Sequence, residues 1–315
     1  MGKVAFIFPG QGSQKVGMGL DLANEYPVCK KIFDAADERL QFSLSEIIFS
    51  GPAETLKKTE NTQPALLTTS VAILALLKEH GISADYVAGH SLGEYTALVA
   101  AQAMSFEDAV YTVRKRGLFM EEAVPFGQGG MAAVLGMDRK QLENVTKEVT
   151  ENGDLVQLAN LNCPGQIAIS GTKAGVEKAS LLAKEKGARR VIPLEVSGPF
   201  HSELMKPAAE KLAAVLDEVA ISNAEIPVIA NVTADIMQEA DDIKQKLIEQ
   251  IYSPVLWEDS VRKLLELGVD TFVEIGPGSV LTGLVRKVDR SVKTYNVSDK
   301  ESVMKFVDEF KKEAK

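Results

Sequence analysis

The feature that most constrains the fold of this chain is the repeated alternation of strand and helix patterns. Residues 4–8 form an unbroken apolar run that ends at a Pro-Gly turn. Such a run is typical of a strand buried on both faces of a parallel sheet. A second strand pattern covers 85–88, and helix patterns cover 64–80, 92–103 and 106–123. This order predicts an α/β fold with a parallel sheet.

A second module follows a glycine-rich change of composition at 125–130. Its patterns read strand, helix, strand, strand, helix, strand, at 131–135, 138–150, 155–161, 167–170, 174–186 and 189–196. The order βαββαβ is typical of a ferredoxin-like unit. Strand patterns at 227–231 and 271–275 then resume the first alternation. We therefore predict a small ferredoxin-like subdomain, residues 128–197, inserted into a large α/β domain, residues 1–127 and 198–315.

Composition excludes several classes of protein. The chain has 35 Lys and Arg against 44 Asp and Glu, a net charge of −9. Because phosphate affinity depends on clustered cations, we expect no nucleic-acid partner. No run reaches the roughly 18 apolar residues of a membrane span, and no signal peptide precedes the first strand. Two cysteines provide neither a disulfide framework nor a metal cluster. We expect a cytoplasmic monomer that contacts no membrane and binds no metal.

Gly89-His90-Ser91-Leu92-Gly93 matches the pattern G-x-S-x-G between a strand and a helix. In that context the serine sits on a sharp turn, with its hydroxyl exposed beside the helix N-terminus. The flanking glycines allow the neighbouring backbone to approach closely. The alternative is an ordinary tight turn in which the serine caps the helix. The context favours Ser91 as a nucleophile.

A serine nucleophile needs a base, and this chain has three histidines. His80 ends a helix pattern, where an imidazole commonly caps carbonyls. His90 adjoins the nucleophile, so its side chain projects in a different direction. His201 lies in a loop after a strand pattern, a position from which it can reach across the strand ends. Elimination therefore favours His201 as the base.

The oxyanion of an acyl-transfer intermediate needs two donors. The backbone N–H of Leu92 is the first candidate, and the loop at residues 9–14 is best placed to supply the second. That loop does not fit a nucleotide-binding fingerprint, because Lys15 stands where the third glycine is needed. Two arginines, Arg114 and Arg116, flank the apolar face of the helix at 106–123. Either could pair with a substrate carboxylate, and helical geometry does not choose between them.

Taken together, these segments resemble the bacterial malonyl-CoA:acyl carrier protein transacylase family over nearly the whole chain. The resemblance rests on seven segments in the family's order, at residues 8–14, 89–95, 114–117, 160–162, 199–202, 250–257 and 274–278. It implies a large α/β-hydrolase-like domain with the inserted ferredoxin-like subdomain. It also implies Ser91 as nucleophile and His201 as base, the latter oriented by the main-chain carbonyl of Gln250.

The resemblance further assigns the binding residues. Gln11 and Leu92 would donate their backbone N–H groups to the oxyanion, and Arg116 would bind the malonyl carboxylate. Asn160 and Asn162 match positions that line the coenzyme A or pantetheine cleft. Phe200 matches malonyl-preferring members.

The implied reaction transfers malonyl from malonyl-CoA to the phosphopantetheine thiol of acyl carrier protein by a ping-pong mechanism. It needs no cofactor and supplies extender units for fatty acid synthesis, although the sequence does not exclude a polyketide pathway. Two alternatives remain. A hydrolase could use the same side chains, and a binding module could share the scaffold without catalysis.

Overall fold

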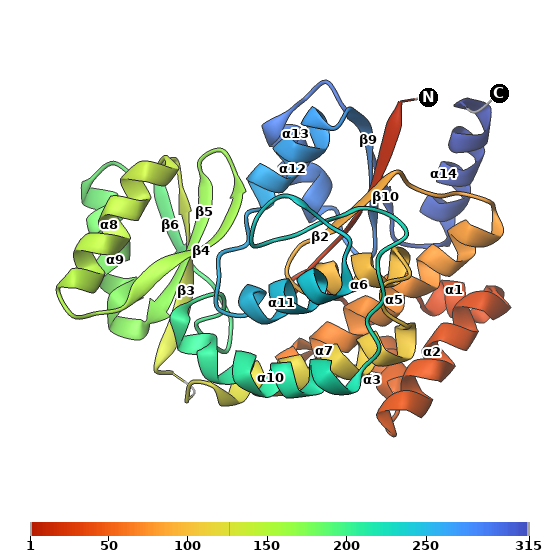
Figure 1. Ribbon diagram of the computed structural model, residues 1–315, viewed down its shortest axis with the longest axis horizontal. Helices are drawn as coiled ribbons and strands as arrows, with labels where there is room; N and C mark the ends of the chain where they lie inside the picture. Colours follow the sequence, from red (N-terminus) through yellow and green to blue (C-terminus); the bar gives the residue numbers. More distant parts are fainter. Residues whose placement is uncertain (1, 126, 314–315) are drawn as a thin grey trace.

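The computed structural model describes residues 2–125 and 127–313 and contains two sheets, each covered by helices (Figure 1). A six-stranded sheet forms the centre of the larger part, and a four-stranded sheet forms the centre of the smaller part. The predicted α/β architecture with a ferredoxin-like subdomain is therefore confirmed. Among the helices of the described segments, none is long and apolar enough to cross a membrane.

The larger sheet is parallel except at one edge, where β7 and β8 run antiparallel. β1 pairs with β2 in a register that sets Phe8 opposite Gly89. The loops that follow these two residues therefore leave the sheet at the same edge, where α/β proteins bind ligands. In spatial order the strands are β10 (Lys293–Val297), β9 (Val269–Ile275), β1 (Lys3–Phe8), β2 (Tyr86–Gly89), β7 (Val228–Ile229) and β8 (Ile236–Met237).

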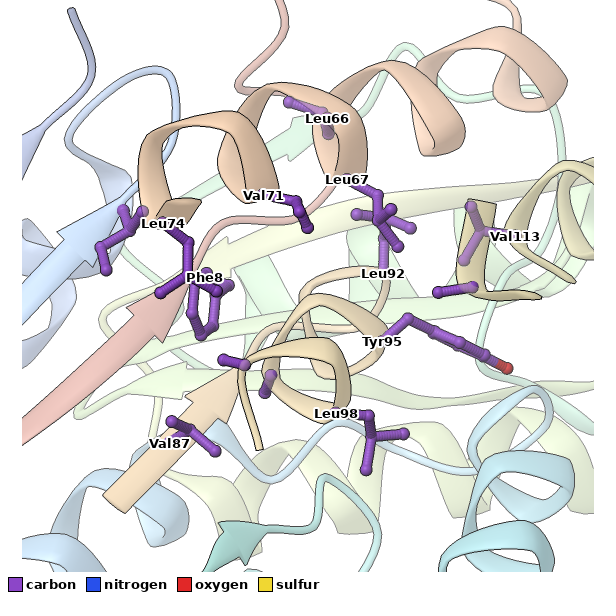
Figure 2. Close-up of a cluster of buried hydrophobic side chains, with 14 of the residues drawn as sticks. Phe8, Leu66, Leu67, Val71, Leu74, Val87, Leu92, Tyr95, Leu98 and Val113 are labelled. Carbon is purple, nitrogen blue, oxygen red and sulfur yellow. The ribbon is translucent and has the colours of Figure 1, made fainter. Parts of the chain in front are cut away.

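Helices pack on both faces of this sheet and bury its side chains. Figure 2 shows part of the main core, in which Phe8 of β1 shares one apolar cluster with Leu67 and Val71 of α5, Leu92 just before α6 and Val113 of α7. The helices of the larger part are α1 (Leu20–Glu25), α2 (Pro27–Leu40), α3 (Leu44–Ser50), α4 (Ala53–Lys57), α5 (Thr59–Glu79), α6 (Gly93–Ala100), α7 (Phe106–Glu122), α10 (Lys206–Glu218), α11 (Ala240–Gln250), α12 (Trp257–Glu266), α13 (Val280–Val288) and α14 (Lys300–Glu313), with a 3-10 turn at Glu203–Met205.

The smaller sheet is antiparallel, with strand order β4-β5-β3-β6, the arrangement of a ferredoxin-like unit. Its own apolar cluster packs α8 and α9 against the sheet (Figure 1). Its elements in chain order are β3 (Gly129–Leu135), α8 (Arg139–Glu151), β4 (Val156–Cys163), β5 (Gln166–Thr172), α9 (Lys173–Glu185) and β6 (Arg190–Pro193).

A short backbone pairing joins the larger and the smaller part of the structure. Leu161 N–H donates to Val255 O at 2.9 Å, and Val255 N–H donates to Ala159 O at 2.8 Å. Strand β4 of the smaller sheet is thereby fixed to the segment before α12. The domain bounds proposed above remain a prediction, and Phe126 of the predicted linker lies outside the described residues.

One helix begins earlier than the sequence predicts. α5 starts at Thr59, so Pro64 lies inside it and cannot donate to the carbonyl of Glu60 four residues before. Arg114 satisfies that carbonyl instead, because its Nη1 donates to Glu60 O at 2.7 Å. The side chain of a neighbouring helix thus compensates for the hydrogen bond that proline removes.

Candidate active site

The turn between β2 and α6 holds Ser91 in the left-handed backbone region, with φ of 51°. Neighbouring backbone lies so close that only glycine fits on either side. A Cβ on Gly89 would lie 1.9 Å from Gly93 O, and a Cβ on Gly93 would lie 2.1 Å from Phe8 O. The spacing of the two glycines therefore permits the sharp turn that presents the serine hydroxyl.

Ser91 and His201 lie within hydrogen-bond distance, 110 residues apart in the chain. Ser91 Oγ is 2.8 Å from His201 Nε2, and His201 Nδ1 is 2.8 Å from the main-chain oxygen of Gln250. Because a carbonyl oxygen only accepts, Nδ1 carries the proton and Nε2 presents its lone pair to the serine. The arrangement is that of a nucleophile, a base and a neutral group that orients the base.

Burial sets the protonation state of His201. Burial, helped by the nearby positive charge of Arg116, lowers the pKa of its imidazole to about 3, while the bond to Gln250 O opposes the shift. The imidazole is therefore neutral at physiological pH and can accept the serine proton.

Arg116 of α7 lies beside this pair, with a side chain that is only 1% exposed. Its Nη2 lies 3.1 Å from Ser91 Oγ and donates to Gln250 Oε1 at 2.8 Å. Its Nη1 donates to Gln63 Oε1 at 2.8 Å. No carboxylate of the described residues pairs directly with this guanidinium. Arg114 points elsewhere, to the backbone of Glu60, so the structure separates the two arginines that the helix pattern left equivalent.

A cavity of about 130 Å³ opens onto Ser91. Gln11 and Leu92 line it, and no hydrogen bond joins the backbone N–H of either residue to another atom of residues 2–125 and 127–313. Unpartnered donors beside a nucleophile suit a developing oxyanion. Further lining side chains are Met120, Met131, Asn160, Leu194, Val196 and Phe200.

Asn162 does not line this cavity, unlike Asn160. Its Oδ1 lies 2.8 Å from His90 Nε2, and the His90 ring packs 5.6 Å from that of Trp257. The remaining histidine, His80, follows the end of α5, and its backbone N–H donates to carbonyls of the last helical turn. Neither of these two histidines contacts Ser91 Oγ.

Sequence reasoning missed three polar residues of this site. Asn231 Oδ1 accepts the N–H of Ser91 at 2.8 Å, Glu94 binds Asn231, and Gln63 binds Arg116. Glu94 could have been found, since it directly follows the G-x-S-x-G pattern. No local pattern marks Asn231 or Gln63, because each reaches the site only through the packing of another element.

The family of acyl transferase domains matches residues 5–314 of this chain. Malonyl CoA-acyl carrier protein transacylase of Bacillus subtilis is 64% identical over 313 residues, which cover 99% of each chain. A solved malonyl CoA-acyl carrier protein transacylase from Clostridium perfringens is 42% identical, with a TM-score of 0.96 over 99% of this chain and 98% of that one.

A solved malonyl-transacylase in complex with the holo acyl carrier protein of a type II polyketide synthase is 43% identical. Its TM-score is 0.95, over 98% of this chain and 99% of that one. The identity extends over nearly the full length of every one of these proteins. This chain is therefore an acyltransferase that belongs to the malonyl-CoA:acyl carrier protein transacylase family.

Proposed function

We propose that this chain transfers a malonyl group from malonyl-CoA to the phosphopantetheine thiol of acyl carrier protein, through a malonyl ester on Ser91. The observation that carries the proposal is the contact of one hydroxyl with both a neutral imidazole and a buried guanidinium. The imidazole activates the oxygen, and the guanidinium selects an acyl group that carries its own carboxylate.

In the first half of the reaction, His201 Nε2 takes the proton of Ser91 as Oγ attacks the thioester carbonyl. The backbone N–H groups of Gln11 and Leu92 stabilise the oxyanion. The C–S bond then breaks, and the thiolate of coenzyme A leaves with the proton from the imidazolium. The carbonyl oxygen of Gln250 keeps the ring oriented throughout.

In the second half, the carrier thiol enters the same cavity and loses its proton to His201. Its sulfur attacks the Ser91 ester, and the serine oxygen recovers the proton when the C–O bond breaks. A thiol is a good enough leaving group that the exchange needs only malonyl-CoA, the carrier thiol and these side chains. This is a ping-pong cycle, and its product is an extender unit for fatty acid synthesis.

Charge explains the preference for malonyl. A malonyl carboxylate bound at Arg116 offsets the positive charge that lowers the pKa of His201. The imidazole therefore becomes a stronger base when malonyl is bound. An acetyl group instead leaves the buried guanidinium of Arg116 without a direct anionic partner. Phe200 and Asn160 would enclose the acyl group and the pantetheine arm, and the His90 bond to Asn162 would fix β4 beside them.

The proposal is tested by incubating the protein with malonyl-CoA in the presence and absence of holo acyl carrier protein, while malonyl-carrier, free malonate and free coenzyme A are measured. We expect carrier loading that matches coenzyme A release, and loss of both in Ser91→Ala. Rapid free malonate without carrier loading would instead show a hydrolase. Binding of malonyl-CoA without release of coenzyme A would show a binding module.

A further inference from the structure

Glu94, in the first turn of α6, is a buried carboxylate with no role in the proton transfers above. Its side chain is 1% exposed. Oε1 accepts the backbone N–H of Asn231 at 2.7 Å, and Oε2 accepts Gln250 Nε2 at 2.5 Å. Among the described residues, no hydrogen bond joins Glu94 to His201, so it is not the acid of a serine triad. A buried carboxylate is costly unless its partners compensate, which raises the question of what it stabilises.

One chain of hydrogen bonds from Glu94 leads through Asn231 to the backbone of Ser91. Asn231, whose N–H is held by Glu94, accepts the N–H of Ser91 through Oδ1 at 2.8 Å. The Asn231 side chain also donates to Gly89 O at 2.7 Å. These bonds fasten the backbone that leads into Ser91, the residue with left-handed φ. Glu94 thus supports the strained turn through one intermediate residue.

The other chain of hydrogen bonds from Glu94 leads through Gln250 to the guanidinium of Arg116. A carboxylate only accepts, so the amide nitrogen of Gln250 must face Glu94 and the amide oxygen must face the opposite side. That oxygen accepts Arg116 Nη2 at 2.8 Å. With the amide reversed, its N–H groups would face the guanidinium, which has donors only. Ser91 O accepts the same Gln250 nitrogen at 2.9 Å, so Glu94 and this carbonyl together hold the amide with its acceptor toward Arg116.

The side-chain amide of Gln250 also separates the negative charge of Glu94 from the positive charge of Arg116. A direct Glu94–Arg116 pair would occupy the guanidinium with a protein carboxylate and remove the reason for it to bind a substrate carboxylate. Through Gln250, Arg116 receives a neutral acceptor and an attractive field from Glu94, yet remains without a direct anionic partner. The guanidinium is thus oriented and compensated at a distance.

On the basis of the function proposed above, we propose that Glu94 is a positioning residue for malonyl selectivity. It fixes the side-chain amide of Gln250, and thereby holds Arg116 in the orientation that receives the substrate carboxylate. The main-chain carbonyl of Gln250, which orients His201, belongs to the same residue but does not depend on the amide orientation.

The test compares Glu94→Gln with Glu274→Gln. Glu274 is a matched control, because it is also buried and accepts backbone N–H groups, those of Leu281 and Thr282, but does not contact the Ser91 site. The measured quantity is the ratio of kcat/KM for malonyl-CoA to that for acetyl-CoA. In Glu94→Gln the new amide can donate to Gln250 Oε1 and reverse that amide. We expect the ratio to fall at least about fivefold, mainly through KM for malonyl-CoA.

Glu274→Gln is expected to leave the ratio unchanged even where it lowers thermal stability. An unchanged ratio in Glu94→Gln, while the wild-type protein still loads malonyl onto the carrier, would overturn the positioning role and leave the proposed function intact. Equal losses of kcat for both substrates would also overturn it, because they indicate general damage to the turn.

A second measurement uses the pH dependence of the same ratio. Burial raises the pKa of Glu94 to about 7, while the bonds from Asn231 and Gln250 and the charges of Arg116 and Lys246 oppose the rise. Protonation of Glu94 removes one acceptor, while the His201 imidazole, with its pKa lowered by burial to about 3, stays neutral over this range. The wild-type ratio should therefore fall as pH is lowered from about 8 to about 6, whereas Glu94→Gln should show no such dependence. A wild-type ratio that is constant over this range would contradict the role.

Discussion

Replacing Arg116 by alanine should abolish most of the discrimination between malonyl and acetyl groups. The guanidinium is almost completely buried, and its Nη2 lies 3.1 Å from Ser91 Oγ, the oxygen that would carry the acyl group in the proposed ester. The malonyl carboxylate is a few bonds from that oxygen, so it reaches the guanidinium without movement of the backbone. An acetyl group has no carboxylate that could bind the guanidinium.

The expected size follows from this burial. Two unit charges about 4 Å apart attract by about 4 kcal/mol at an effective dielectric constant of about 20. Loss of one partner of a buried charged pair costs about 2–5 kcal/mol, in agreement with that value. At about 1.4 kcal/mol per factor of ten, the malonyl-to-acetyl ratio of kcat/KM should fall roughly 30- to 4000-fold.

The assay measures acyl transfer to holo carrier protein from malonyl-CoA and acetyl-CoA in competition. Arg114→Ala is the matched control, because Arg114 lies on the same helix but binds Glu60 O and Asn61 Oδ1, outside the cavity. Its ratio should stay within about twofold of wild type. A variant lacking Arg116 that still strongly prefers malonyl would refute the reasoning, as would an equal loss of preference in the Arg114 variant.

Three further predictions follow from the same geometry. Since burial lowers the pKa of His201 to about 3, its imidazole stays neutral below the usual histidine range. In Glu94→Gln, which removes the titration of Glu94, kcat/KM for acetyl-CoA should therefore show no inflection near pH ~6.5 in a pH-rate profile; a titration there would contradict the assignment. Asn231→Ala leaves the N–H of Ser91 without its acceptor, and kcat for both acyl-CoAs should fall about tenfold or more in steady-state assays, with KM nearly constant; an unchanged kcat would argue against a supporting role. Gly93→Ala places a Cβ 2.1 Å from Phe8 O and should lower the free energy of unfolding by more than about 2 kcal/mol in denaturant titrations, whereas Gly130→Ala, with open space around its Cβ, should change it far less.

Much of the fold could be predicted because each element has a local pattern. The apolar run at 4–8 forms β1, and the order of the second module gives its sheet order directly. The sharp turn at Ser91 was predictable for the same reason, since its two glycines stand at the positions where any side chain would collide. With few histidines in the chain, elimination selected His201, and the structure places it 2.8 Å from the serine.

The parts that could not be predicted depend on long-range packing. Arg114 and Arg116 flank the same helix face, and only the position of α5 and α11 beside α7 decides which of them reaches the cavity. Asn231 lies within the predicted strand pattern at 227–231 but just beyond the observed strand β7, and nothing in that pattern shows that its side chain will reach the N–H of Ser91. The predicted start of α5 at Pro64 is wrong, because proline usually stands in the first turn of a helix. Nothing in the local sequence shows that Arg114 will bind the carbonyl of Glu60, which Pro64 leaves without a donor.

The most direct test of the covalent mechanism is peptide mass mapping after a rapid quench of the protein with malonyl-CoA alone. We expect a single malonyl ester on the peptide that contains Ser91, and its discharge when holo carrier protein is added before the quench. Carrier loading at the normal rate with no ester on that peptide, or with the ester on another residue, would contradict transfer through Ser91.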